Sequence, residues 1–366
     1  MFACDNMESI DEYIKILKIQ LGQELSNKKL IYLDLNFWIN LRKCMTNEKV
    51  ESDYYKFYDL LLALVEQKKV LCPINHSVFS ELLKQGDIES RINTAKVIDL
   101  FSNSVTLIFE FEKEKLELQY YIRQHLLNEQ YLTPIEQNVW VKIPYVMGVA
   151  VPYNENIDEE TQKKIQIEFF KYSWTITLEE MMKNYMRDEV LPFLDMSKTA
   201  SSLNEGKFSH SDEMKTIRNL FKVELKGVLS VFRNLVTEYF KWLSKNHPEI
   251  LKLLNDNYKI AHPRDLCAKI EDDILNDKIG NYLPRIYIMT CIYTLMRWDK
   301  ERKFKANDLY DFEHARAALP YYQYFFTEGP LKHSVTMKPY ELSNKYGCIV
   351  ENEIKVINNL LTKMAS

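Results

Sequence analysis

Residues 30–41 read LIYLDLNFWINL, and this stretch decides how the rest of the chain is interpreted. Leu30 to Leu33 form a short run of apolar and strand-favouring side chains, which is typical of a buried strand. Asp34 ends the run, and apolar residues at helical spacing follow it. The stretch therefore predicts a buried strand that leads directly into a helix, with an acidic side chain at the junction.

The segments on either side continue this alternation of helices and strands. The expected elements are an N-terminal helix within 1–27, a helix over 53–69, a strand at 70–74, a helix capped by Ser77, a helix over 88–101 and a strand at 105–109. Strands that alternate with helices favour a parallel sheet with helices on both faces. Residues 28–112 are therefore expected to form the first part of an α/β domain.

The alternation stops near residue 113 and returns near residue 280. Residues 113–279 are expected to form a large all-helical insertion, in which Lys198–Asp212 looks like a loop. In residues 280–366, a helix precedes an apolar strand at 322–327, and a weaker strand follows near 348–350. The predicted fold class is thus α/β, with a parallel sheet flanked by helices and assembled from the N- and C-terminal segments.

Composition narrows the function classes. The 48 basic and 52 acidic residues give a net charge of −4, so any attraction of nucleic acid must come from a local basic surface. The six cysteines show no zinc-like spacing and are expected to be reduced and buried. No apolar stretch is long enough for a membrane span, and the N-terminus does not resemble a signal peptide. A soluble, cytoplasmic protein is expected.

Acidic side chains stand at the places where a parallel sheet binds ligands. Asp34 and Glu328 each follow a strand, and the carboxyl ends of parallel strands form one edge of a sheet. Glu81 and Asp311 lie near the starts of helices that flank such strands. Carboxylates gathered in this way repel one another unless cations neutralise them, and oxygen ligands suit Mg²⁺ or Mn²⁺. These four acids are the candidate catalytic and metal-binding residues.

Four short motifs around these acids resemble those of the PIN-domain nucleases. The motifs are Tyr32-Leu33-Asp34-Leu35-Asn36, the helix start Ser77 to Leu82 with Glu81, Asp311 at its spacing before Thr327, and the closing run Phe325-Phe326-Thr327-Glu328. The resemblance covers roughly residues 28–110 and 280–366 and leaves out the insertion. The family more often has Asp at the last acidic position, where this chain has Glu328.

The resemblance implies hydrolysis of a phosphodiester bond by metal-activated water, with RNA as the expected substrate and DNA as the alternative. Asp34, Asp311 and Glu328 would bind the metal, and Glu81 would bind it or orient the water. Asn36 and Thr327 would support the ligands or contact phosphate, and His314 is a weaker candidate for the same contact. A toxin-like or defence role is a further hypothesis. It predicts that expression affects host growth or phage infection only when Asp34 is intact.

Several simpler interpretations stay open. Asp308 lies one helical turn before Asp311, and it either shares the metal site or caps the helix. A basic cluster precedes it at Arg297, Lys300, Arg302, Lys303 and Lys305, and this cluster is either a phosphate-binding surface or a solvated helix end. The haloacid-dehalogenase type is disfavoured because Asn36 stands where its second acid is needed. The alternative function is a catalytically weak PIN-like scaffold that binds RNA, or a protein partner through the insertion.

Overall fold

A four-stranded parallel sheet lies at the centre of the computed structural model, which describes residues 9–184, 196–209 and 215–365. The strand order is β2-β1-β5-β6. The strands are β1 (Lys29–Leu33), β2 (Val70–Leu71), β5 (Tyr324–Phe326) and β6 (Ile349–Glu351). The first two come from the N-terminal segment and the last two from the C-terminal segment. The prediction of a parallel sheet assembled from both ends of the chain is therefore confirmed.

Strand β1 is central because its side chains are apolar on both faces. Ile31 and Tyr32 are fully buried, as expected of a parallel strand covered by helices on each side. Its neighbour β5 pairs in the register Ile31 to Tyr324. The pairing continues past the strand end, where the backbone N–H of Asp34 donates to the carbonyl oxygen of Phe326 at 3.2 Å. The first residue after β1 is thus fixed beside the end of β5.

A second, two-stranded sheet corrects the prediction of an all-helical insertion. Strand β3 (Val105–Leu107) pairs antiparallel with β4 (Trp140–Lys142), which lies inside residues 113–279. Thr106 is also bridged in parallel to Ile74, just after β2. Because β4 has only three residues and two of them are buried, it shows no alternating pattern from which sequence could have identified it.

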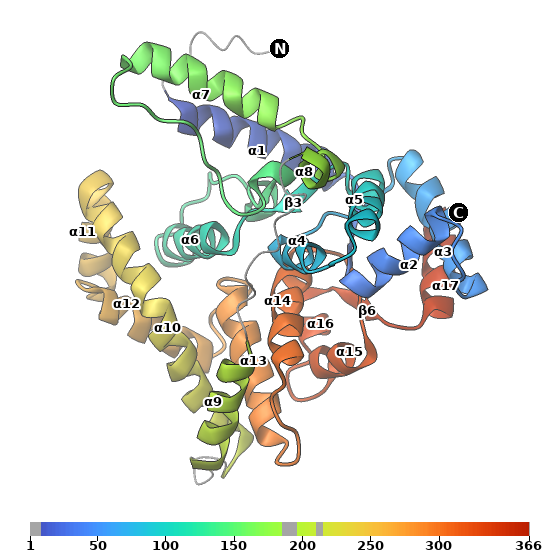
Figure 1. Ribbon diagram of the computed structural model, residues 1–366. Coiled ribbons are helices and arrows are strands. Elements are labelled where there is room, and N and C mark those ends of the chain that lie inside the picture. The colour runs from blue at the N-terminus through green and yellow to red at the C-terminus, as the bar shows by residue number, and fades with distance from the viewer. Residues whose placement is uncertain (1–8, 185–195, 210–214, 366) are drawn as a thin grey trace.

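Helices make up most of the remaining structure (Figure 1). Around the sheet they are α1 (Ile10–Ser26), α2 (Leu35–Met45), α3 (Ser52–Glu66), α4 (His76–Leu83), α5 (Ile88–Ser102), α13 (Pro284–Trp298), α14 (Ala306–Tyr321), α15 (Gly329–Thr336), α16 (Leu342–Tyr346) and α17 (Ile354–Ala365). In the insertion they are α6 (Glu110–Tyr120), the π-helix η2 (Tyr121–Leu126), the 3-10 helices η3 (Ile135–Gln137) and η4 (Ile143–Tyr145), α7 (Glu159–Ser173), α8 (Leu178–Asn184), α9 (Met196–Ser209), α10 (Ile217–Asn246), α11 (Pro248–Tyr258) and α12 (Pro263–Leu275). Helices α9 to α12 form an arm in which α10 packs on α13, α9 packs on α14, and α11 and α12 pack on α10, while α7 lies along α1.

Two local expectations are wrong. Helix α4 is capped by Asn75 instead of Ser77, because the Asn75 side-chain oxygen accepts the backbone N–H of Val78 at 3.1 Å. Residues 198–209 lie in α9 and do not form a loop, while 210–212 fall outside the described residues. The buried ammonium of Lys207 binds the carbonyl oxygens of residues 296, 299 and 302, so α9 is held by tertiary contacts at the end of α13.

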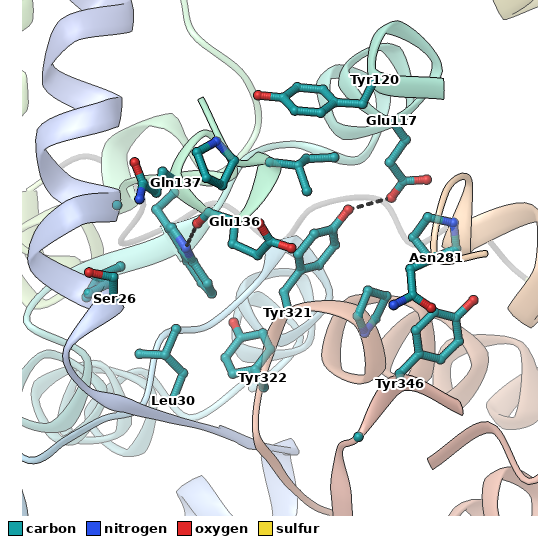
Figure 2. A pocket seen from close by; sticks show the side chains of 18 of the residues that line it. Ser26, Leu30, Glu117, Tyr120, Glu136, Gln137, Asn281, Tyr321, Tyr322 and Tyr346 are labelled. Atoms are coloured by element: carbon teal, nitrogen blue, oxygen red, sulfur yellow. Dashed lines mark hydrogen bonds between the residues drawn. The ribbon is translucent and has the colours of Figure 1, made fainter. Parts of the chain in front are cut away.

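The opposite edge of the sheet from Asp34 contains a cavity of about 790 Å³ (Figure 2). Leu30, Gln323 and Gly347 line it, and each stands at or just before the start of a strand. The cavity therefore lies at the amino ends of β1, β5 and β6. Helix α1, the α6 region and the segment before α13 complete its walls.

The cysteines within the described residues are free and buried, as predicted. They are Cys44, Cys72, Cys267, Cys291 and Cys348. Among the described helices, none combines the length and the apolar character that crossing a bilayer requires.

Packing of α1 against the 135–137 turn yields a test of this fold. A methyl group at Gly22 would overlap the backbone of Gln137, whereas Gly227 on the exposed face of α10 has open space around it. Gly22→Ala should lower the free energy of unfolding by about 1–3 kcal/mol despite the better helix propensity of alanine. Gly227→Ala should raise it by roughly 0.5–1 kcal/mol. Urea denaturation of both variants measures the difference, and equal effects would contradict the packing described.

Candidate active site

Asp34 and Thr327 stand side by side at the carboxyl ends of β1 and β5. Both side chains are buried, at 7% and 2% exposure, whereas Glu328 next to them is exposed. The Asp34 carboxylate caps α2 by accepting the backbone N–H groups of Asn36 (3.1 Å) and Phe37 (3.4 Å). The structure thus brings the first and last predicted motifs to one edge of the sheet.

The Asp34 carboxyl is costly to ionise where it lies. Burial raises its pKa from 3.8 to about 6, and the nearby charge of Glu328 adds to the rise. His314 and the hydroxyl hydrogen bond from Thr327 act in the opposite direction. An aspartate that caps a helix at the protein surface keeps a low pKa. A capping role alone therefore does not account for the raised pKa of Asp34.

Asp311, on the first half of α14, shares the same environment. Burial raises its pKa to about 6 as well, and Asp308, Glu328 and Glu81 raise it further while His314 lowers it. The charges of Glu81 and Glu328 are thus close enough to change the ionisation of Asp311. All four candidate acids are electrostatically connected at this edge of the sheet.

His314 sits at the centre of a buried hydrogen-bonded chain. Its Nε2 atom lies 3.3 Å from Glu81 Oε2, and its Nδ1 atom lies 2.6 Å from the hydroxyl oxygen of Tyr32. The Tyr32 hydroxyl donates to Asn75 Oδ1 at 2.8 Å, and that oxygen can only accept. Tyr32 therefore accepts the Nδ1–H of His314, and the ring carries a proton on each nitrogen. The chain of contacts makes His314 an imidazolium.

The pKa directions agree with this protonation state. Burial alone would lower the pKa of His314, but Glu81 in contact and Asp34 and Asp311 nearby raise it above its ordinary value. Burial would likewise raise the pKa of Glu81, yet its contact with His314 outweighs burial and lowers it. His314 and the half-buried Glu81 thus form an ion pair, whereas Asp34 and Asp311 make no ion pair with any residue that the structure describes.

The remaining candidates are engaged in local structure. Asp308 Oδ2 accepts the backbone N–H of Lys305 at 2.8 Å as part of a capping box, and its other oxygen lies 3.4 Å from Arg302. Asn36 is exposed on α2, where its side-chain oxygen accepts from Asn40 at 3.3 Å. Capping thus accounts for the contacts of Asp308, and Asn36 faces solvent.

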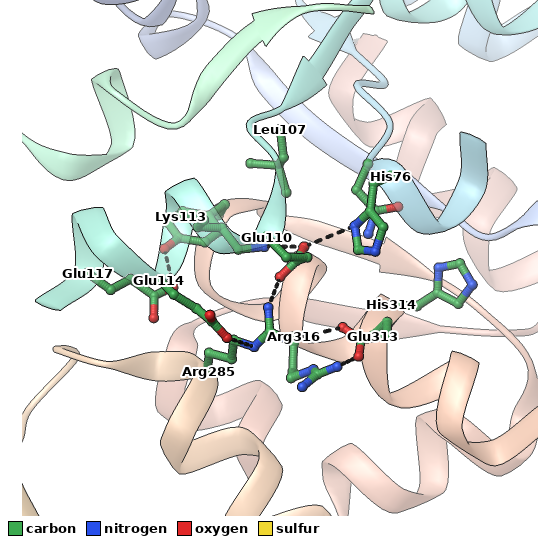
Figure 3. A network of polar contacts seen from close by, with 12 residues as sticks. His76, Leu107, Glu110, Lys113, Glu114, Glu117, Arg285, Glu313, His314 and Arg316 are labelled. Carbon is green, nitrogen blue, oxygen red and sulfur yellow. Dashed lines mark hydrogen bonds and ion pairs between the residues drawn. The ribbon is translucent and has the colours of Figure 1, made fainter. Parts of the chain in front are cut away.

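Sequence reasoning missed a buried ionic network that adjoins the site (Figure 3). Glu110 contacts Lys113 (2.7 Å), Arg285 and His76 (3.4 Å), and Lys113 is fully buried. Burial would raise the pKa of Glu110, but Lys113 and Arg285 lower it well below its ordinary value. The stretch that contains Glu110 reads as a solvated helix face, because four acids and two lysines within eight residues normally face water.

The donor chemistry at the acid edge fits a hard divalent cation, but the donors do not form a closed cage. Within residues 9–184, 196–209 and 215–365, no group of three or more His, Cys, Asp or Glu side chains is positioned to hold a metal ion. Mg²⁺ commonly needs only one or two carboxylates, because waters and substrate phosphates supply the other ligands. Asp34 and Asp311 are the two buried carboxyls at this edge that such a smaller set would use.

The raised pKa of Asp34 predicts a stability cost above pH 6. The folded protein binds this proton more tightly than the unfolded chain, so stability falls as pH rises from about 4 to about 6. Asparagine caps a helix as well as aspartate and carries no charge. Asp34→Asn should therefore raise the free energy of unfolding by about 2–3 kcal/mol at pH 7.5 and leave it nearly unchanged at pH 4.

The matched control is Asp158→Asn, at the exposed cap of α7. The pKa of Asp158 is lowered by hydrogen bonds from Thr161, so this substitution should give no gain at pH 7.5. Urea denaturation at the two pH values measures both variants. If both variants changed the free energy of unfolding equally, burial of the Asp34 charge would not destabilise the folded protein as expected.

The hydrogen-bonded chain predicts a specific effect of Tyr32→Phe. Removing the hydroxyl leaves the Nδ1–H of His314 without its acceptor, so the pKa of His314 should fall and stability should decrease by about 1–3 kcal/mol. Histidine ¹⁵N chemical shifts over a pH titration report the change, with His314→Gln to assign the signal. Tyr172→Phe, at an exposed position, should leave the titration unchanged.

Comparisons with known proteins identify no family. No protein-family model matches the chain, and no curated protein or solved structure shows significant similarity to it. The resemblance to PIN domains therefore rests on the four short motifs alone.

Proposed function

We propose that this protein is a divalent-metal-dependent nuclease of PIN-like type that hydrolyses phosphodiester bonds, with RNA as its substrate class. The observation that carries the proposal is the pair Asp34 and Asp311, whose pKa values are both raised to about 6 by burial and by neighbouring carboxylates. Shifted carboxyls at the carboxyl ends of parallel strands are characteristic of functional sites. A cation bound there would offset both the burial and the repulsion.

Each side chain at the site has a proposed role. Asp34 and Asp311 would hold Mg²⁺ or Mn²⁺, and Glu328 would reach the ion from the end of β5. When bound, the ion supplies an activated water and neutralises charge on the phosphate. The Thr327 hydroxyl donates a hydrogen bond to Asp34 and partly offsets the rise of its pKa. Glu81, kept ionised by His314, would orient the attacking water.

The loop before α14 offers a local surface for the nucleic-acid backbone. Lys300, Lys303 and Lys305 are exposed on it, and they precede the turn of α14 that carries Asp311. Arg302 of the same loop pairs with Asp308, and Lys207 holds the loop by its carbonyl oxygens. Since the whole chain has a net charge of −4, this local arrangement is what would attract phosphates.

Cleavage of labelled single-stranded RNA by the purified full-length chain tests the proposal. Product should form with Mn²⁺ or Mg²⁺ and disappear with EDTA, and Asp34→Asn should reduce the rate by roughly 100-fold or more. Asp158→Asn, the exposed cap, should cleave like the wild type. Replacing Lys303 and Lys305 by alanine should mainly raise KM and weaken its salt dependence.

The second candidate is a PIN-like scaffold that binds RNA or protein without cutting. It is favoured by one observation, that the His314 imidazolium already supplies a positive charge among the acids. Binding of RNA that is equal in wild type and Asp34→Asn, with no metal-dependent product from RNA or single-stranded DNA, would refute the nuclease and favour the scaffold.

A further inference from the structure

Helix α10 lies in the arm (Figure 1) and carries a charge opposite to that of the whole chain. Its net charge is +4, whereas the whole chain has −4, so the rest of the chain has −8. None of its charged residues has a role in the proposed nuclease reaction. The six basic residues of α10 are Arg218, Lys222, Lys226, Arg233, Lys241 and Lys245, and its two acids are Glu224 and Glu238.

Four of these cations form a row along one side of α10, which we call the basic stripe. Its members are Arg218, Lys222, Lys226 and Arg233, and all four are exposed. With 3.6 residues per turn, they fall within about 80° around the helix axis and span roughly 22 Å along it. Within the part of the chain that the structure describes, none of the four makes an ion pair. The stripe is therefore a row of exposed cations without acidic partners.

The two acids of α10 are engaged with other cations. Glu224 pairs with Arg297 at the end of α13, and Glu238 pairs with Lys241 at 2.8 Å. Neither acid is therefore the partner of a residue in the basic stripe. Helices α7 and α8 are built differently, because three of their lysines each pair with a glutamate three or four residues earlier in the same helix. These lysines are Lys164, Lys171 and Lys183.

The basic stripe works against the stability of its own helix. Like charges four residues apart repel one another, and Lys222 has this spacing from both Arg218 and Lys226. The N-terminal end of a helix also disfavours cations, yet Arg218 is the second residue of α10 and no acid stands in the first turn. A polyanion bound along the stripe would offset both effects.

The surroundings of the stripe favour a nucleic-acid backbone over a membrane or a protein groove. Membranes and protein grooves take up the apolar face of a basic helix. That face of α10 is already buried, because Leu225 and Phe232 belong to the hydrophobic core and α10 packs on α12 and α13. Exposed side chains near the stripe are polar, as at Asn219 and Ser230, and the exposed Val231 lies about half a turn away. The stripe therefore offers contacts to phosphates and no ring on which a base could stack.

We propose that the basic stripe binds the phosphate backbone of single-stranded RNA without reading its bases. The choice of RNA as the ligand rests on the proposed nuclease function. Arg218, Lys222, Lys226 and Arg233 each contact a phosphate, and successive cations four residues apart are about 6 Å apart along the helix. The stripe adds these contacts to those of the loop before α14, so it holds a part of the strand that lies outside the acid edge.

Fluorescence anisotropy of a labelled 20-nucleotide oligouridine with the full-length protein tests this assignment, with EDTA present to prevent cleavage. The triple variant Lys222→Ala, Lys226→Ala and Arg233→Ala should weaken binding by about tenfold or more. It should also reduce the slope of log Kd against log salt by about 2, since three phosphate contacts are lost. The variant should fold normally because all three side chains are exposed, and its circular dichroism and urea denaturation check this. Replacing Lys222 and Lys226 by arginine should preserve binding.

The matched control replaces Lys164, Lys171 and Lys183 by alanine. It removes the same charge from lysines that have acidic partners, so the Kd and its salt dependence should stay within twofold of the wild type. The assignment is overturned if both triple variants weaken binding equally. It is also overturned if the stripe is needed for binding to phosphatidylglycerol vesicles while RNA does not bind.

Cleavage with Mn²⁺ separates this assignment from the proposed function. The stripe variant should raise KM for RNA and leave kcat unchanged, because the stripe lies outside the acid edge. If the wild type cleaves RNA and the stripe variant binds and cleaves it equally well, the stripe assignment fails and the nuclease stands. If no variant cleaves but the stripe variant loses RNA binding, the nuclease fails and the stripe assignment stands.

Discussion

The pairing of β1 with β5 is the contact on which the rest of the structure depends. It joins residues 31–33 to residues 324–326 in a parallel ladder, so nearly the whole chain lies between two neighbouring strands. The entropy cost of closing a loop grows slowly with its length, and a large helical insertion is therefore tolerated between them. The same ladder sets Asp34 beside Thr327 and creates the acid edge. Fold and candidate site thus follow from one pairing.

Two groups of buried charges lie near one another, and they are balanced differently. Around Glu110, the chain provides Lys113, Arg285 and His76 as partners, and the pKa of Glu110 falls. At the acid edge, the positive charges of His314 and of Lys84, which acts on Glu81, face the four acids, and the pKa values of Asp34 and Asp311 rise. The first group has more cations of its own, although burial still raises the pKa of Glu114 and raises that of Glu117 to about 7. At the second group, the raised pKa values of Asp34 and Asp311 are the physical reason for expecting an external cation.

The parts of the fold with a strong local pattern could be predicted from sequence. The strand that ends at Asp34, helices α3 and α13 and the strand before Thr327 have long or distinct apolar patterns, and the structure contains them. Helix α9 was missed because its serines, glycine and asparagine favour a loop locally, while Lys207 and Asn204 stabilise it through contacts with residues near 300. Tertiary contacts of this kind leave no periodic signal in the sequence.

The site shows the same division between local and long-range information. Asp34 and Glu328 could be identified because each directly follows a strand. The roles of His314 and Tyr32 depend on a contact between residues 282 positions apart, and the ion pair of Arg285 with Glu110 joins residues 175 positions apart. Short motifs indicate which side chains are candidates. The partner that sets each protonation state is known only once the chain is folded.

Helix α14 connects the two ends of the sheet. It carries Asp311 and His314 at the acid edge, and its last residue, Tyr321, lines the cavity. The ten residues from Asp311 to Tyr321 span about 15 Å of helix, so one element touches both places. The cavity wall therefore includes the end of the helix that carries Asp311. This separation lets the two edges of one small sheet carry different chemistry, with charge concentrated at one and aromatic surface at the other.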